Sequence, residues 1–156
     1  MKLVIQRVTH AKVSSEGAML GEIGPGYMIL LGVGEGDKEK EATFLADKVV
    51  KLRMMNDDQK SFDKLRTRKM NRSIVEANGE ILVVSQFSLY ADTSGGRRPS
   101  FIKAAKPEIS KPLYELFINE LKRLGVKKVA TGQFGAYMDV EIHNDGPVTI
   151  IIDSKE

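Results

Sequence analysis

ILVVSQFSLY, at residues 81–90, is the stretch that decides the fold. Ile81 to Phe87 is predicted to be a buried strand, because its aliphatic run has no polar alternate face. Ser85, Gln86 and Ser88 place two hydroxyls and an amide where this strand ends. The sequence therefore predicts a central strand that ends in neutral hydrogen-bonding groups but offers no strong base.

The residues before this stretch predict an opening pair of strands and then a helix. Lys2 to Val8 and Tyr27 to Val33 are rich in Val, Ile and Leu, and the glycines and proline between them favour a hairpin or meander. From Lys38 to Met55 the apolar residues follow helical spacing, and Asp37 stands where an N-cap would. The apolar positions of that helix are Leu45, Val49, Leu52 and Met55.

The residues after the central strand predict a second helix and three more strands. Leu113, Phe117, Leu121 and Leu124 share one helical face, with Gly125 beyond its end as a cap. Strands are predicted at Val126 to Thr131, Tyr137 to Ile142 and Pro147 to Asp153. Asn144-Asp145-Gly146-Pro147 fits a tight turn between the last two strands.

Strands clustered around two helices are typical of an α/β protein of the α+β type. We expect a mixed, largely antiparallel sheet covered by the two helices. The length of 156 residues is close to that of one common domain, so residues 1–156 are predicted to form a single domain.

The composition excludes several classes of site. The chain has no cysteine, which excludes thiolate nucleophiles and disulfide scaffolds. His10 and His143 are the only histidines, so a multi-histidine metal site is not expected. No stretch approaches the length of a membrane span, and Gln6 and Arg7 interrupt the N-terminal apolar run, which is too short for a signal sequence. We expect a cytoplasmic protein without membrane attachment.

Basic residues gather in parts of the chain despite a modest net charge of +3. The stretch from Asn56 to Arg72 carries six basic residues and is usually typical of a solvated loop, although it could also lie against phosphates. Gly32, Gly34 and Gly36 follow a strand, but their spacing does not match a phosphate-binding loop, and Glu35 and Asp37 oppose a phosphate there.

The residues alone leave three interpretations of the polar groups open. Ser85 and Ser88 fit hydroxyls that are satisfied by nearby backbone. They also fit a serine esterase, although no G-x-S-x-G occurs and neither histidine has an obvious serine partner. A nucleic-acid-binding module without catalysis would agree with the basic runs and with the absence of an evident general base.

The order of short motifs closely resembles that of the D-aminoacyl-tRNA deacylases along nearly the whole chain. The matching motifs are Ile5-Gln6-Arg7-Val8, Ile29-Leu30-Leu31-Gly32-Val33, Met70-Asn71, Ser85-Gln86-Phe87-Ser88-Leu89, Arg98-Pro99-Ser100-Phe101, Thr131-Gly132, Phe134-Gly135-Ala136-Tyr137-Met138 and Asn144-Asp145-Gly146-Pro147-Val148-Thr149. Each motif is weak by itself, but all of them in this order make a chance match very improbable.

The resemblance implies a homodimeric enzyme that hydrolyses the ester between a D-amino acid, or glycine, and the terminal ribose of tRNA. It implies a cis peptide between Gly146 and Pro147, which would enter the partner's pocket and reject L-aminoacyl groups. Phe87 would supply an oxyanion-binding N–H with help from Gln86. Ser88 stands where the family usually has Thr, so a nucleophile, an orienting group and simple packing all remain open for it.

The resemblance also implies where the rest of the substrate would lie. Ser85 belongs to the substrate-binding motif, and Ala105, Phe134 and Met138 match positions around the terminal adenosine. The following basic residues are candidates for the tRNA backbone: Arg97, Arg98 and Lys103. The expected partners are charged tRNA and a second copy of the chain, and no cofactor or metal is expected.

Overall fold

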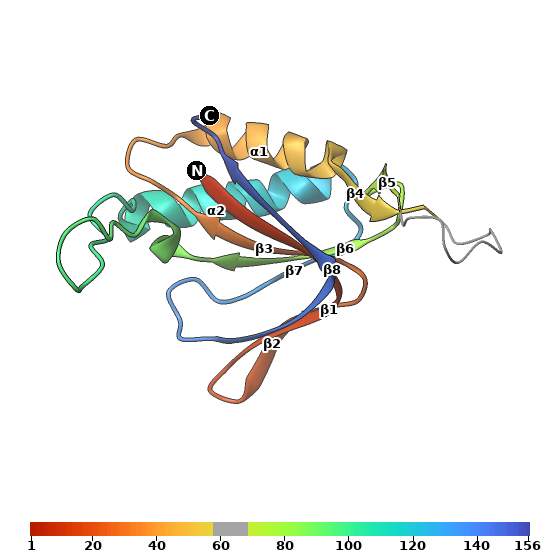
Figure 1. The fold of residues 1–156 in the computed structure, drawn as a ribbon, viewed down its shortest axis with the longest axis horizontal. Coiled ribbons are helices and arrows are strands. Elements are labelled where there is room, and N and C mark those ends of the chain that lie inside the picture. The colour runs from red at the N-terminus through yellow and green to blue at the C-terminus, as the bar shows by residue number, and fades with distance from the viewer. Residues whose placement is uncertain (58–68) are drawn as a thin grey trace.

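A mixed β-sheet forms one layer of the protein and two helices cover one of its faces (Figure 1). The computed structural model describes residues 1–57 and 69–156. In these residues the sheet has six strands in the order β2-β1-β3-β6-β7, with β8 paired to β1. The strands are β1 (Lys2–Ser15), β2 (Ala18–Ile23), β3 (Gly26–Gly32), β6 (Glu80–Ser85), β7 (Val129–Thr131) and β8 (Asp139–Asp153). Because β1 pairs antiparallel with β2, β3 and β8, while β6 pairs parallel with β3 and β7, the predicted fold class is confirmed.

The two helices, α1 (Glu39–Lys51) and α2 (Pro107–Arg123), pack side by side on the sheet (Figure 1). Helix α2 ends as predicted, with Gly125 at a φ of +100° just beyond it. A small second sheet joins β4 (Arg53–Asn56) to β5 (Met70–Ser73). A short 3₁₀ helix, η1 (Phe87–Tyr90), follows β6 directly.

Strand β6 is buried on both faces, as its aliphatic run predicts. Ile81 and Val83 point into the large core between sheet and helices, while Leu82 and Val84 point into a smaller core on the other face. This alternation follows from the two-residue period of a strand. The end of β6 is therefore fixed by packing on both sides, which makes it a rigid support for the residues that follow.

The N-terminal strand is longer than predicted. It continues beyond Val8 to Ser15 and is followed by β2, which the sequence analysis did not identify. The polar residues Thr9 and His10 look like the end of a strand, but both lie within β1, which pairs with β8 on one edge throughout this region.

Helix α1 is shorter than predicted, and the N-cap prediction for Asp37 was wrong. The N-cap is Lys38, whose main-chain N–H donates to the Glu41 side chain at 2.8 Å. Leu52 follows the helix and Met55 lies in β4. Asp37 is instead buried, with its carboxylate 2.7 Å from the α-ammonium of Met1.

The two strands predicted at residues 137–142 and 147–153 fall in one strand, β8, which begins only at Asp139, and the predicted tight turn is a bulge in it. Gln6 pairs with Thr149 and Val8 pairs with Asn144, so residues 145–148 stand opposite Arg7 alone. Since β1 continues as the partner on both sides of the bulge, the chain does not reverse direction there. The turn-forming residues allow the bulge to project from the sheet.

The structure leaves part of the basic stretch untested. Residues 58–68, including Lys64, Arg66 and Arg68, lie outside the described residues, while Arg72 lies in β5. No helix in the described part of the chain is long and apolar enough to span a membrane.

Candidate functional site

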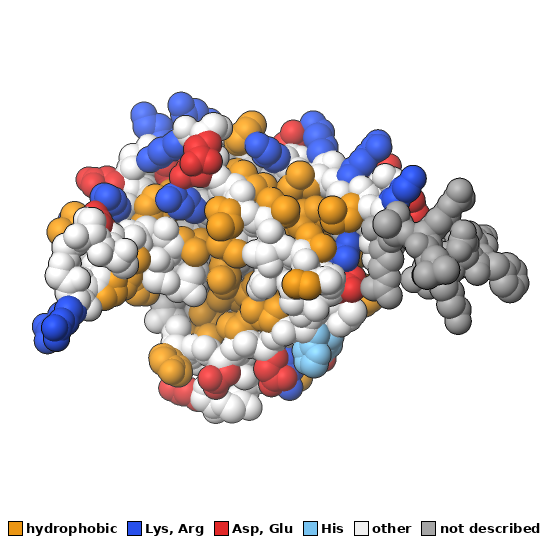
Figure 2. All heavy atoms as spheres, in the orientation of Figure 1, with side chains coloured by type: hydrophobic (Ala, Val, Ile, Leu, Met, Phe, Trp, Pro, Cys, Tyr) orange, Lys and Arg blue, Asp and Glu red, His pale blue; other side chains and the backbone are white. Residues whose placement is uncertain are grey.

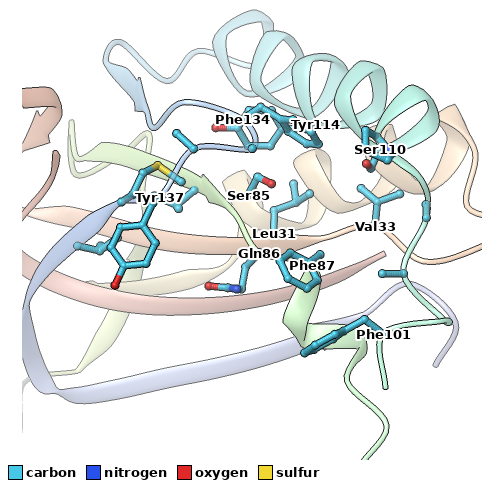
Figure 3. Close-up of a pocket in the computed structure, with 18 residues that line it drawn as sticks. Leu31, Val33, Ser85, Gln86, Phe87, Phe101, Ser110, Tyr114, Phe134 and Tyr137 are labelled. Atoms are coloured by element: carbon cyan, nitrogen blue, oxygen red, sulfur yellow. The ribbon is translucent and has the colours of Figure 1, made fainter. Parts of the chain in front are cut away.

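A pocket of about 620 Å³ opens where β6 ends (Figure 3). Its walls come from the ends of β3 and β6, the segment after η1, the first turns of α2 and the segment before β8. Its lining side chains are Leu31, Val33, Val84, Ser85, Gln86, Phe87, Phe101, Ala104, Ala105, Pro107, Ser110, Tyr114, Phe134, Ala136, Tyr137, Met138 and Val140, with Gly135. None of these lining residues carries a charge.

The residues at the end of β6 that line this pocket differ in how their main-chain N–H groups are used. The N–H of Gln86 is used, since it donates to the carbonyl of Leu31 at 2.7 Å and ties the end of β6 to β3. Phe87 begins η1, and no hydrogen bond between described residues uses its N–H. A free N–H at the first residue of a helical turn is expected, because no carbonyl precedes it at the right spacing.

Ser88 lies behind Gln86 rather than in the pocket wall. The side-chain amide of Gln86 donates to the Ser88 hydroxyl at 2.6 Å, while Ser88 is not among the lining residues. The hydroxyl thus fixes the direction of the Gln86 side chain, which Figure 3 shows beside Phe87 at the edge of the pocket.

The opposite wall is formed by α2 and contains residues that the sequence analysis missed. The Tyr114 hydroxyl donates to the carbonyl of Val83 at 2.9 Å and so fastens α2 to β6. Burial raises the pKa of this phenol above its usual value, which keeps it a neutral donor. Its ring contacts that of Phe134, with 5.9 Å between centroids. The helical pattern marked only the apolar face, so Tyr114 and Ser110 gave no signal in the sequence.

A third wall of the pocket, which contains Ala104 and Ala105, is connected by hydrogen bonds to the buried ion pair between Asp37 and Met1. Ala105 donates its N–H to Val33 at 2.9 Å, and Ala104 forms an isolated bridge with Gly34. The N–H of Gly34 in turn donates to the Asp37 carboxylate at 2.7 Å. Asp37 is therefore a support for this wall.

The structure brings together six of the residues predicted for the site. Ser85, Gln86, Phe87, Ala105, Phe134 and Met138 all line the pocket. Arg97 and Arg98 are exposed in the loop that projects at one end of the molecule, where Figure 2 shows basic side chains at the tip. Lys103 is also exposed, but its ammonium lies 2.8 Å from the Asp92 carboxylate at the base of that loop.

Gly146 and Pro147 do not line the pocket of their own chain. Both are exposed at the bulge of β8, and the peptide between them is cis. Gly146 has a φ of +124°, and a Cβ there would lie 2.8 Å from a methyl group of Val148. Arg7 is buried beneath the bulge, where its Nε atom lies 3.0 Å from the Asp145 carboxylate. Its Nη1 atom donates hydrogen bonds to the Met54 carbonyl and to the side-chain oxygen of Asn56.

The two histidines lie away from the pocket. Their rings contact each other edge to face at 5.4 Å between β1 and β8, and His10 is 2.7 Å from a carboxylate oxygen of Glu22. Neither lines the pocket or bonds to Ser85 or Ser88. The arrangement gives no support to a histidine-activated serine in the described residues.

The chain matches known proteins along almost its whole length. The family model described as D-Tyr-tRNA(Tyr) deacylase matches residues 4–153. A D-aminoacyl-tRNA deacylase of Roseiflexus castenholzii is 56% identical over 154 residues, which are 99% of this chain and 92% of that protein. A protein of the same name from Bacillus velezensis is 51% identical over 156 residues, with 100% of both chains covered.

Solved structures share the fold. That of the c-Myc DNA Unwinding Element Binding Protein superposes with a TM-score of 0.87 at 36% identity and covers 98% of both chains. That of a probable eukaryotic D-amino acid tRNA deacylase has a TM-score of 0.79 at 16% identity and covers 97% of both chains. The second likeness speaks for the fold alone.

Proposed function

The chain belongs to the D-Tyr-tRNA(Tyr) deacylase family, and we propose that it hydrolyses the ester that joins a D-amino acid to the terminal ribose of tRNA. The observation that carries the proposal is the uncharged pocket at the end of β6, lined by Phe87, whose N–H takes part in no hydrogen bond between the described residues. Such a site suits an ester, because a main-chain donor can stabilise a developing oxyanion where no charged group competes.

In the chemical step, the N–H of Phe87 would donate to the ester carbonyl oxygen as negative charge develops on it. Gln86 would help through its side-chain amide, which keeps a second hydrogen while the first is donated to Ser88. The 2′-hydroxyl of the terminal ribose and a water would handle the proton, so the protein would act chiefly by positioning and polarising.

Chiral selection would come from Gly146 and Pro147 of the partner subunit. Their main-chain carbonyls would receive the substrate ammonium and fill the space into which an L side chain projects, while a D side chain points toward solvent. A steric barrier of about 5 kcal/mol would protect L-esters several thousandfold. Glycine has no side chain to exclude, so glycyl-tRNA would also be accepted.

A homodimer is supported by the surface around the bulge. Because Gly146 and Pro147 are exposed and line no part of their own pocket, they are free to reach another one. Three isoleucines of β8, Ile142, Ile150 and Ile151, are exposed, and Ile151 is 73% exposed. Figure 2 shows hydrophobic side chains gathered in the middle of this face, as expected of a surface that another subunit covers.

The remaining predicted residues fit the tRNA end of the substrate. Ala105, Phe134 and Met138 would surround the terminal adenosine, with Ser85 beside them at the end of β6. Arg97, Arg98 and Lys103 would contact the tRNA phosphates. An enzyme that acts on charged tRNA would work in the cytoplasm.

A second candidate is a nucleic-acid-binding role without catalysis. It is favoured by one observation, the 36% identity to a protein named for binding a DNA unwinding element. The two proposals differ in turnover, since a binding module would retain tRNA without releasing an amino acid.

The proposed function is tested by following amino-acid release from D-aminoacyl-tRNA and from the matched L-aminoacyl-tRNA, with no metal added. We expect rapid release from the D-ester and protection of the L-ester. Binding without release would support the second candidate, and equal rates for both enantiomers would contradict the chiral selection.

A further inference from the structure

Two aromatic rings stand exposed at the mouth of the pocket. Phe87 is 57% exposed and Phe101 is 38% exposed, although both are large apolar residues. Their rings meet edge to face at 4.9 Å with an interplanar angle of 77° (Figure 3). The pair is preorganised in a favoured aromatic geometry, so it presents a fixed ring surface to solvent.

A basic loop begins next to this pair. Asp92 and Ser100 exchange main-chain hydrogen bonds of 2.7 and 2.9 Å and close the loop that carries Arg97 and Arg98. Phe101 follows Ser100 directly. At roughly 3.6 Å per residue, the Cα atom of Arg98 lies within about 11 Å of that of Phe101.

The base of the loop is held by a side-chain cluster as well. The Asp92 carboxylate accepts hydrogen bonds from the N–H and the hydroxyl of Ser94 and pairs with Lys103 at 2.8 Å. The Lys103 ammonium and the Ser94 donors hold the pKa of Asp92 below its usual range. These contacts fix both ends of the loop that carries the two arginines, directly next to Phe101 in the chain.

Exposed aromatic rings close to two arginines are suited to binding unpaired nucleotides. Single strands are bound by stacking bases on aromatic side chains while basic groups follow the phosphates. The pocket itself has room for the aminoacylated terminal nucleoside, so the chain that leads into it must pass its mouth.

On the basis of the proposed function, we infer that Phe101, braced by Phe87, is a stacking platform for the base of the nucleotide that precedes the terminal adenosine of tRNA. Its phosphate faces the loop that carries Arg97 and Arg98. The aromatic pair therefore distinguishes a substrate that has a polynucleotide chain from one that ends at the adenosine.

The experiment compares two substrates, D-aminoacyl-tRNA and D-aminoacyl-adenosine, and measures the ratio of their kcat/KM values. Phe101→Ala and Phe101→Leu should lower the ratio about 5- to 100-fold, the range expected for one stacked base. Phe101→Tyr should restore it, because the ring is kept. Ile102→Ala is the matched control, since Ile102 is adjacent and 84% exposed but does not line the pocket, and it should leave the ratio unchanged.

A third substrate tests stacking directly. Replacing the penultimate nucleotide of the tRNA with an abasic one should lower the wild-type ratio as Phe101→Ala does, and the two changes together should cost no more than either alone. If Phe101→Ala lowered kcat/KM equally for D-aminoacyl-adenosine and D-aminoacyl-tRNA, the stacking platform would be contradicted. Full additivity of Phe101→Ala with the abasic change would contradict it as well. A wild-type protein that cleaves neither substrate would overturn the proposed function itself.

Discussion

At the end of β6, residues 85–87 border a pocket whose other walls come from the same chain, whereas residues 145–148 of β8 project from the sheet edge and border no part of it. The first region is held by main-chain bonds to β3 and by packing on both faces. The second lies over the buried side chain of Arg7, which contacts the Asp145 carboxylate, and the Asn144 side chain donates to the Val148 carbonyl at 3.3 Å. Under the proposed function, the half of the site that binds the ester would be complete within a subunit, and the half that selects between enantiomers would be offered to a partner subunit.

Replacing Gly146 with Ala is the strongest way to break this division. A Cβ at a φ of +124° is strained in any L residue, and it would lie 2.8 Å from Val148 and 3.1 Å from Arg7. The bulge must shift, so we expect most of the D-over-L preference to be lost, about a thousandfold in the ratio of the two deacylation rates. The measurement is single-turnover release from both aminoacyl-tRNAs.

Gly17→Ala is the matched control for that variant. Gly17 has a φ of +80° with nothing within 4 Å of its missing Cβ, at the turn between β1 and β2. It should cost about 1 to 2 kcal/mol of stability and leave the enantiomer ratio unchanged. If Gly146→Ala behaved like Gly17→Ala, the bulge would have no part in selection.

Asp37→Asn tests how much the buried ion pair with Met1 stabilises the chain that forms the pocket. The change leaves the Met1 ammonium buried without a countercharge, so we expect a loss of about 3 kcal/mol in the free energy of unfolding. Urea denaturation measures it. Lys51→Ala, which removes an exposed pair with Asp47, should change stability by less than about 1 kcal/mol.

The same variant has a defined pH dependence. Burial tends to raise the pKa of Asp37, but hydrogen bonds from the Met1 ammonium and the Gly34 N–H outweigh it and leave the pKa below its usual value. A lowered pKa stabilises the fold fully above the unfolded value near pH 4, and the contribution fades as the pH falls through the folded value. The stability gap between wild type and Asp37→Asn should therefore be constant between about pH 5 and about pH 7 and shrink in acid. A gap that widened in acid would contradict this assignment.

The sequence could predict the elements whose cause is local. The strand predicted from Ile81 to Phe87 correctly identified β6, although β6 ends at Ser85 and Phe87 begins η1. The apolar face formed by Leu113, Phe117 and Leu121 correctly identified α2. Asp37 was misassigned because its partner, Met1, is 36 positions away and no local pattern announces it. The bulge of β8 was taken for a turn because Asp, Gly and Pro fit both, and only the continuing pairing with β1 separates the two.

The site was predicted unevenly for a similar reason. The lining residues Ser85, Gln86 and Phe87 followed from the resemblance, since they form one continuous motif. Tyr114 was missed because a tyrosine on an amphipathic helix looks like ordinary packing, and its bond to Val83 joins elements 31 positions apart. Phe101 and Tyr137 lay within matching motifs but had no assigned role until the pocket brought them to its rim.

Arg7→Met tests whether the buried Arg7 side chain supports the bulge at residues 145–148. Methionine preserves much of the buried stem but removes the ion pair with Asp145 and the hydrogen bonds to Met54 and Asn56. The bulge loses its anchor but keeps its backbone, so we expect the D-over-L ratio to fall about tenfold, less than for Gly146→Ala. Rates are measured on folded protein verified by circular dichroism. Arg53→Met is the control, since Arg53 is an exposed residue on the neighbouring strand β4, and it should leave the ratio unchanged.

Ser88→Ala should have the smallest effect and asks whether the end of β6 acts by geometry or by covalent chemistry. The hydroxyl accepts a hydrogen bond from Gln86, neither histidine contacts it, and it does not line the pocket. Removing an orienting partner should slow deacylation less than about tenfold, because the N–H of Phe87 is untouched. Ser88→Thr keeps the hydroxyl and should match wild type. A loss of more than about a thousandfold in a folded Ser88→Ala protein would instead require a serine nucleophile, and the pocket would then act by attack and not by polarising the ester.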